Sequence, residues 1–168
     1  VNSLLETTVY VNGIPPLDHP RSVAAPTASY LRDSHVVFGV VVNGQARAYP
    51  KRILAWHEMA LDRVGNTELT IVYCTLCGTV IPYKSVVGGV HRTFGTSGLL
   101  YRSNKLMFDR ETMSLWSTLE GRPVIGRLAV VMASTASWLP GAALMPGMLT
   151  RSLFQCTESA EFFRIGMV

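Results

Sequence analysis

The chain has 168 residues, of which 48% are hydrophobic and 15% are Asp, Glu, Lys or Arg. A chain of this length buries roughly 70% of its unfolded surface on folding, and its high apolar and low charged shares exclude the kind of disorder that comes from low hydrophobicity and charge repulsion. The formal net charge is +4. Because the basic residues are scattered rather than clustered, we expect no nucleic-acid partner.

The chain has three cysteines, Cys74, Cys77 and Cys156. This number is too small for a multi-disulfide framework, and because it is odd, at least one cysteine has no disulfide partner within the chain. The chain starts at Val1 with no basic segment followed by an apolar core, so no signal peptide is visible in it. We expect membrane contact only through an anchor that would precede Val1. The uncharged stretch from Leu128 to Thr150 contains two Pro-Gly pairs, which argue against a membrane-spanning helix.

In chain order, the first clear element is a β-hairpin. Residues 36–42 form a β-branched run, Asn43-Gly44 is the dipeptide favoured by two-residue turns, and residues 45–49 complete the second strand. Pro50 can then begin a helix. Apolar residues recur from Ile53 to Leu61 at helical spacing, which predicts an amphipathic helix over residues 50–64 that ends at Gly65.

The remainder of the pattern is mostly β. Residues 68–73 and 79–87 read as strands, and Pro82 should place the second of them at a sheet edge or a bulge. Gly88-Gly89 turns into residues 90–94, residues 95–98 read as a loop, and residues 99–108 and 114–119 read as further strands.

These elements predict the α+β class, with antiparallel hairpins that form a sheet or a partly open barrel and one main helix. We expect a single domain over residues 1–128. Residues 129–168 have an atypical, apolar composition, and we expect this tail to be poorly ordered.

The strongest chemical motif is Cys74-Thr75-Leu76-Cys77-Gly78. Two thiols at this spacing can converge on one metal ion or close as a disulfide. One such pair supplies half of a tetrahedral site, so further ligands would have to come from elsewhere. His57 and Glu58 on the predicted helix are the candidates, with His91 or a water as alternatives. A C-x-x-C pair can also serve only as a structural clip.

Other candidate residues point to ligand binding. Arg47 and Tyr49 share one face of a predicted strand and could hold an anion. Ser97 lies in the Gly- and Ser-rich loop, whose amides could also bind an anion. The loop lacks the pattern of a nucleotide-binding motif, so we expect no nucleotide cofactor.

Six ordered motifs resemble the domain-of-unknown-function family numbered 3179, over about residues 12–128. They begin at Gly13, Gly44, Arg52, Tyr73, Phe94 and Asp109, respectively. The resemblance implies a C-x-x-C domain of the kind found in exported or lipid-anchored proteins, and it carries no established activity. Thr75 stands where proline is commoner in the family, and the tail after about Ala129 departs from the family's usual charged ending.

Three functional hypotheses follow. The first is a soft-metal site for Cu or Zn made by Cys74, Cys77, His57 and Glu58. The second is an extracytoplasmic thiol–disulfide redox protein, in which His57 or Arg47 lowers a thiol pKa. The third is a non-enzymatic binding module around Arg47, Tyr49 and Ser97, with the cysteines as a clip. These hypotheses leave both an enzyme and a non-enzyme open, and the partner is unknown.

Overall fold

The computed structural model describes residues 12–131, 145–148 and 163–167 of the chain. Strands predominate in it, and α1 (Lys51–His57) is the main helix. The shorter helices are η3 (Ala25–Thr27) and α2 (Arg127–Val131). The strands are β1 (Leu17–Asp18), β2 (Arg21–Ala24), β3 (Val36–Val42), β4 (Gln45–Pro50), β5 (Met59–Val64), β6 (Thr67–Tyr73), β7 (Val80–Lys84), β8 (Val86–Val87), β9 (Val90–His91), β10 (Phe94–Tyr101), β11 (Asn104–Asp109), β12 (Leu115–Ser117), β13 (Arg122–Ile125), β14 (Met145–Met148) and β15 (Phe163–Met167).

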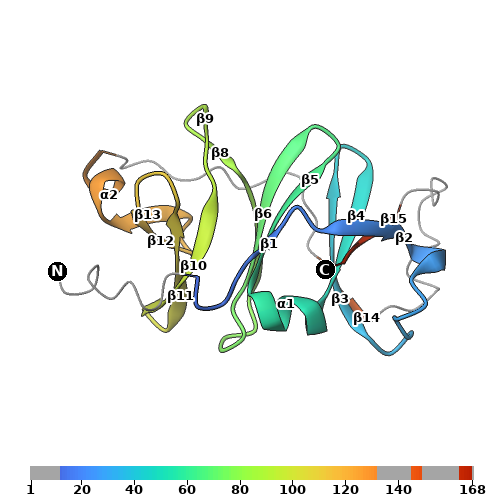
Figure 1. The fold of residues 1–168 in the computed structure, drawn as a ribbon. Helices are drawn as coiled ribbons and strands as arrows, with labels where there is room; N and C mark the ends of the chain where they lie inside the picture. The colour runs from blue at the N-terminus through green and yellow to red at the C-terminus, as the bar shows by residue number, and fades with distance from the viewer. Residues whose placement is uncertain (1–11, 132–144, 149–162, 168) are drawn as a thin grey trace.

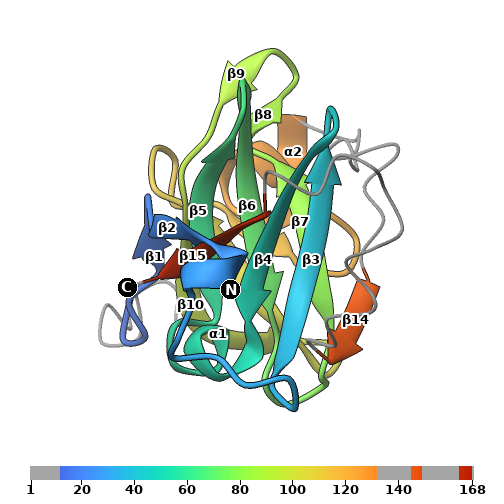
Figure 2. The same cartoon turned by 90° about the vertical axis from the view of Figure 1, so that its right-hand side faces the viewer.

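The strands form three main sheets that follow one another across the molecule (Figure 1). The middle sheet has the order β1-β5-β6-β7. On one side of it lies the sheet β10-β11-β12-β13, and on the other lies the sheet β14-β3-β4-β15-β2, which faces the viewer in Figure 2. Most pairings are antiparallel, whereas β1 with β5 and β15 with β4 are parallel.

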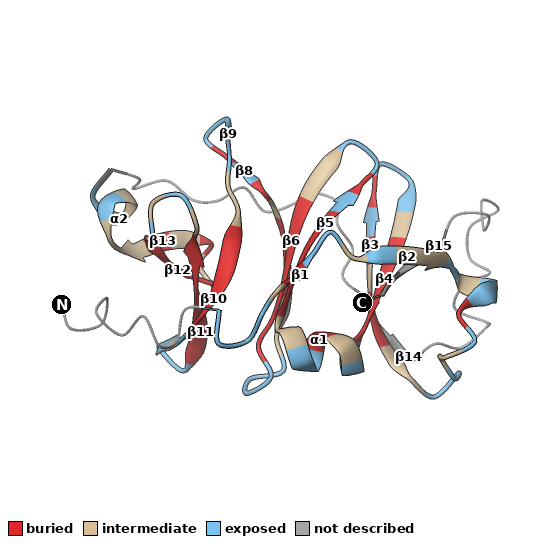
Figure 3. Cartoon of the chain, viewed as in Figure 1, coloured by how far each residue is buried: buried red, intermediate tan, exposed pale blue. Residues whose placement is uncertain are grey.

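The middle sheet is buried on both faces, as the red strands at the centre of Figure 3 show. Side chains alternate along β5: Ala60 packs with Val40 and Tyr49 of the β3–β4 side, whereas its neighbour Leu61 packs with Trp116 of the β10–β13 side. Two cores therefore share one sheet. This arrangement fixes the middle sheet more firmly than packing on a single face could, since each face removes apolar surface from water.

The helix predicted over residues 50–64 is only half correct. Its first part is α1, but the chain leaves the helix at Glu58, which adopts a left-handed conformation with φ 56°. Residues 59–64 are strand β5, and Gly65 belongs to the β5–β6 turn rather than to a helix end. The apolar residues of this stretch fill both cores, and a strand buried on both faces lacks the period-2 signature that distinguishes it from a helix.

Several other predictions are confirmed. Strands β3 and β4 form the expected hairpin, with Asn43 and Gly44 both at positive φ, 50° and 77°. Pro82 lies in β7, which is the edge strand of its sheet. Proline has no N–H to donate, and an edge strand tolerates this because one of its sides has no neighbouring strand. The loop predicted at residues 95–98 is wrong, because these residues belong to β10 and accommodate a bulge between Thr96 and Leu100.

The fold is thus more β-rich than the predicted α+β class, with the one main helix as expected. Within the described ranges the sheets do not close into a barrel. Of the predicted tail, strands β14 and β15 pair with the sheet of β3 and β4, and most of residues 132–168 lies outside the described residues. None of the described helices combines the length and hydrophobicity needed to span a bilayer.

Gly95 provides a test of the packing between β10 and β11. A Cβ at this position would lie 2.5 Å from Phe108 Cε1 and 2.7 Å from Asn12 Oδ1. We expect Gly95→Ala to lower the free energy of unfolding by about 1–3 kcal/mol through overpacking. Leu100→Ala, at a 54% exposed position of the same strand, should change it by less than about 0.5 kcal/mol. Chemical denaturation of both variants measures this, and equal stabilities would contradict the packing.

Candidate functional site

The cysteine pair lies in the loop that joins β6 to β7. Cys74 directly follows β6, and its amide donates to the carbonyl of Thr79 at 2.8 Å, which extends the strand pairing by one step. The amide of Gly78 returns to the carbonyl of Cys74 at 2.8 Å. Gly78 has φ 67°, a conformation that glycine adopts without strain. The loop therefore closes on itself and brings the side chain of Cys77 back over the strand ends.

Cys77 is exposed, and its sulfur has polar neighbours. Asn104 Nδ2 lies 2.9 Å from Cys77 Sγ, and Thr79 Oγ1 lies 3.0 Å from it. The first of these groups can only donate a hydrogen bond, and the second can donate one. The site is thus arranged to hold negative charge on this sulfur.

Cys74 has a different environment, although the two sulfurs are close enough to share a hydrogen bond. The residue is 3% exposed. Main-chain amides of Cys77 and Lys105 approach its sulfur. One cysteine of the pair is therefore accessible and the other is enclosed.

The two thiols have opposite pKa shifts. Burial raises the pKa of the Cys74 thiol, and its hydrogen bond to Cys77 raises it further. Burial alone would raise the pKa of Cys77 too, but hydrogen bonds from Cys74, from the Thr79 hydroxyl and from main-chain amides bring that pKa below its ordinary value. A lowered pKa marks the sulfur that becomes the thiolate, which is the nucleophilic form of cysteine.

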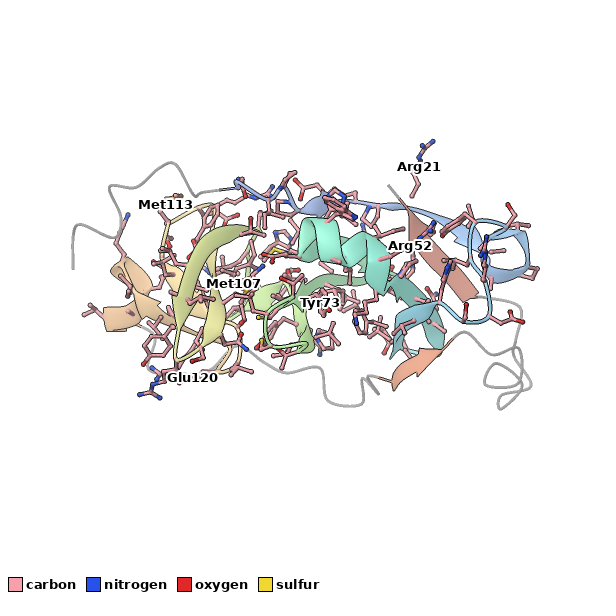
Figure 4. All side chains as sticks on the ribbon, turned by 90° about the horizontal axis from the view of Figure 1, so that it is seen from below. Arg21, Arg52, Tyr73, Met107, Met113 and Glu120 are labelled. Carbon is pink, nitrogen blue, oxygen red and sulfur yellow. The ribbon has the colours of Figure 1, made fainter. Side chains whose placement is uncertain are left out.

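A buried ion pair lies next to the loop. Lys105 Nζ lies 2.6 Å from Glu58 Oε2, with side-chain exposures of 6% and 15%. Thr75 Oγ1 donates to the other carboxylate oxygen of Glu58 at 2.9 Å. The backbone of Glu58 is held as well, since its carbonyl accepts the amide of Tyr73 at 2.8 Å. Figure 4 shows Tyr73 close to α1 and Met107 on the side of the β10–β13 sheet.

Desolvation lowers the pKa of Lys105, whereas Glu58 and the charges of both cysteines raise it. The ammonium of Lys105 is therefore within electrostatic reach of both sulfurs. Glu58 serves as the partner of Lys105 and Thr75, which is a different arrangement from the metal ligand that the sequence suggests.

His57 faces the N-terminal segment. Its Nδ1 lies 2.8 Å from the carbonyl oxygen of Pro15, and because a carbonyl only accepts, Nδ1 carries the proton. The ring also borders a surface cavity of about 330 Å³ with Arg52, Ile53 and Trp56. In the described part of the chain, no group of three or more His, Cys, Asp or Glu side chains is placed to hold a metal ion. The structure therefore does not assemble His57 and Glu58 with the two cysteines into one cluster.

Arg47 and Tyr49 do share a face, as predicted, and there they meet a carboxylate of the same chain. Tyr49 donates to Asp62 Oδ2 at 2.8 Å, and Arg47 Nη1 lies 3.5 Å from the same oxygen. Burial raises the pKa of Tyr49 well above its ordinary value. The charge of Asp62 and the hydrogen bond to it raise this pKa further, whereas the charge of Arg47 lowers it. Arg47 also borders a cavity of about 460 Å³ between the tips of the β3–β4 and β5–β6 hairpins.

Ser97 lies apart from Arg47 and Tyr49, in strand β10 of the sheet β10-β11-β12-β13. It is 2% exposed, and its hydroxyl donates to the carbonyl of Leu106 at 2.6 Å. The amide of Leu99 donates to Ser97 Oγ at 3.1 Å, so Ser97 stabilises the bulge of β10. His91, in β9, borders a separate cavity of about 90 Å³. A ligand bound by Arg47, Tyr49 and Ser97 stays a prediction.

Reasoning from the sequence missed two residues of the cysteine site. Asn104 and Lys105 begin β11 and reach the C-x-x-C loop across 27 or more positions of the chain. The only trace of them is a polar pair at the start of a strand that is otherwise buried throughout. Such a pair of buried polar residues needs partners, but its partners become visible only in the fold.

Fold and site together define a β-rich domain that carries an asymmetric thiol pair in a hairpin loop. A family model described as "Protein of unknown function (DUF3179)" matches residues 11–138, so the chain belongs to this family. This confirms the resemblance that the sequence motifs indicate. A search of the curated proteins found no match, and a search of the solved structures found none either.

The two cysteines should differ in reactivity. We expect iodoacetamide to label Cys77 at least about tenfold faster than Cys74 at pH 7, because Cys77 is exposed and its pKa is lowered, whereas Cys74 is buried and its pKa is raised. As the pH falls, labelling of Cys77 should persist below the range in which an ordinary thiol, with pKa about 8.5, stops reacting. Quenched labelling followed by peptide mass spectrometry measures both rates. Thr79→Val should slow Cys77, and equal rates for the two cysteines would contradict the assignment.

The buried ion pair should matter for stability mainly when it is broken on one side. Lys105→Met leaves Glu58 without its cation, and we expect it to lower the free energy of unfolding by about 3–5 kcal/mol. The double variant Glu58→Gln with Lys105→Met should recover most of that loss, because no unpaired charge remains. Arg102→Met breaks an exposed pair with Glu120 and should cost less than about 1 kcal/mol. Denaturant titration measures all three, and a double variant no more stable than the single one would count against the pair.

Proposed function

We propose that this domain is a thiol–disulfide redox protein in which Cys77 is the reactive sulfur and Cys74 is its buried partner. The observation that carries the proposal is the set of donors around Cys77 Sγ, with Asn104 Nδ2 at 2.9 Å and Thr79 Oγ1 at 3.0 Å. Donors of this kind stabilise a thiolate, and the thiolate is the attacking species in thiol–disulfide exchange.

Exchange proceeds through a mixed disulfide at the exposed sulfur. A substrate sulfur bonds to Cys77 Sγ, and Cys74 either forms or gives up the bond between the two cysteines in the other half of the reaction. Two thiols lose two protons and two electrons when the internal disulfide forms, and the substrate disulfide takes them up. The sulfur of Cys74 needs contact only with Cys77, which accords with its burial.

The asymmetry of the pair supports this function over the other two. A structural disulfide requires neither an exposed sulfur nor a lowered thiol pKa, and Cys77 has both. A Cu or Zn site would need Cys74 and Cys77 to bind the ion without a third His, Cys, Asp or Glu from the described residues. We also propose that the protein acts outside the cytoplasm, since disulfides persist in oxidising compartments.

Reversible oxidation tests the proposal in a Cys156→Ser background, so that only Cys74 and Cys77 contribute thiols. We expect thiol counting to give two thiols in the reduced protein, none after treatment with oxidised glutathione, and two again after reduction. With Cys74→Ser, Cys77 should be trapped as a stable mixed disulfide with glutathione. In the Cys77→Ser variant, Cys74 should form little or no mixed disulfide with glutathione, because Cys74 is buried.

The same background separates the alternatives. If added Cu(I) or Zn(II) protects both thiols from alkylation at one ion per chain, and no internal disulfide forms, the metal function is correct instead. If a disulfide forms once and glutathione never reduces it, the pair is a structural clip. Unchanged circular dichroism of both serine variants shows that their thiol chemistry, rather than unfolding, is being compared.

A further inference from the structure

Resting on the proposed redox function, we infer that the pair works as a disulfide donor: it oxidises substrates that present two thiols and ends the reaction reduced. The inference rests on the surroundings of Cys77, which favour the reduced thiolate over the disulfide. Asn104 Nδ2 and Thr79 Oγ1 both lie within hydrogen-bond distance of its sulfur. Main-chain amides approach both sulfurs as well.

These contacts act on charge. A thiolate sulfur accepts hydrogen bonds strongly, whereas a disulfide sulfur carries no charge and accepts them weakly. The donors therefore stabilise the reduced form more than the oxidised form. A dithiol–disulfide pair whose reduced form is stabilised has a higher reduction potential and passes its disulfide on to other thiols.

The donor at Asn104 is held rigidly. Asn104 is 4% exposed, and the hydroxyl of Thr118, itself 1% exposed, lies 2.5 Å from Asn104 Oδ1. The carbonyl of Thr118 in turn accepts the hydroxyl of Tyr83. Thr118 Oγ1 also lies 2.7 Å from the carbonyl oxygen of Lys105, so this hydroxyl ties Asn104 to the neighbouring main chain, while Asn104 Nδ2 faces Cys77 Sγ. The amide is thus oriented towards the sulfur before any substrate arrives, and its ordering costs nothing during the reaction.

Lys105 adds less to this effect. Its ammonium reaches both sulfurs electrostatically, but it is paired with Glu58, so the pair is neutral as a whole. Asn104 is the group on which the inference depends. It acts as a positioning and charge-stabilising residue beside the reacting sulfur.

The reaction balances as a two-electron exchange. A substrate thiolate attacks Cys77 Sγ and forms a mixed disulfide, while the bond to Cys74 breaks and Cys74 leaves and takes up a proton. The second substrate thiol loses its proton and attacks the first substrate sulfur. The substrate disulfide forms, and Cys77 leaves as the thiolate that Asn104 and Thr79 hold. A good leaving group at this step favours transfer away from the protein.

Equilibration with reduced and oxidised glutathione tests the inference in the Cys156→Ser background. Asn104→Asp keeps an acceptor for Thr118 but replaces the donor that faces Cys77 with an oxygen. We expect this variant to shift the equilibrium towards the protein disulfide at least about tenfold, which corresponds to about 30 mV for two electrons. The control is Asn66→Asp, the same change at an exposed turn position, which should leave the equilibrium unchanged.

Thr79→Val provides a second variant that removes a donor without adding charge, and it should shift the equilibrium in the same direction by a smaller factor. The inference is wrong if Asn104→Asp and Asn66→Asp have the same equilibrium, or if glutathione fails to reduce the disulfide of the unsubstituted pair. In either case thiol counting combined with intact mass, which separates an internal disulfide from glutathione adducts, still shows whether an internal disulfide forms. The proposed redox function itself fails if no internal disulfide forms or if glutathione never reduces it, whereas equal equilibria of the two Asp variants overturn the disulfide-donor inference alone.

Discussion

The burial of the middle sheet on both faces is the constraint on which the rest of the structure depends. Strands β5 and β6 send alternate side chains into two different cores, so neither strand can shift by one residue without moving apolar groups to the wrong core. Their register is therefore fixed, and with it the place where β6 ends. Cys74 is the next residue, so its position is a consequence of packing rather than of the loop itself.

The same constraint explains why the two cysteines differ. Cys74 continues the strand pairing through its amide bond to Thr79 and stays enclosed. Cys77 lies past the turn, where the loop leaves the sheet, and it is exposed. The sheet of β10–β13 packs against this end of the middle sheet and presents Asn104 to the exposed sulfur. An asymmetric thiol pair thus arises from one strand end, one turn and one neighbouring sheet.

Prediction from sequence succeeded where a local rule decides the structure. The Asn43-Gly44 turn and the edge position of Pro82 depend on backbone preferences of one or two residues. It failed at residues 59–64, where apolar residues on both faces of a strand resemble a helical stripe. It also failed at residues 95–98, where glycine and serine serve a bulge within a strand instead of a loop.

By itself the sequence determined the hairpins, the family and the presence of a closely spaced thiol pair, because these depend on residue types at short spacing. Only the tertiary structure decided what surrounds that pair. It placed Asn104 and Lys105 at the site, directed His57 to Pro15, and used Glu58 and Asp62 as partners for buried cations and hydroxyls. The physical reason is that a hydrogen bond between residues far apart in the chain follows from how sheets pack, and no spacing in the sequence encodes it.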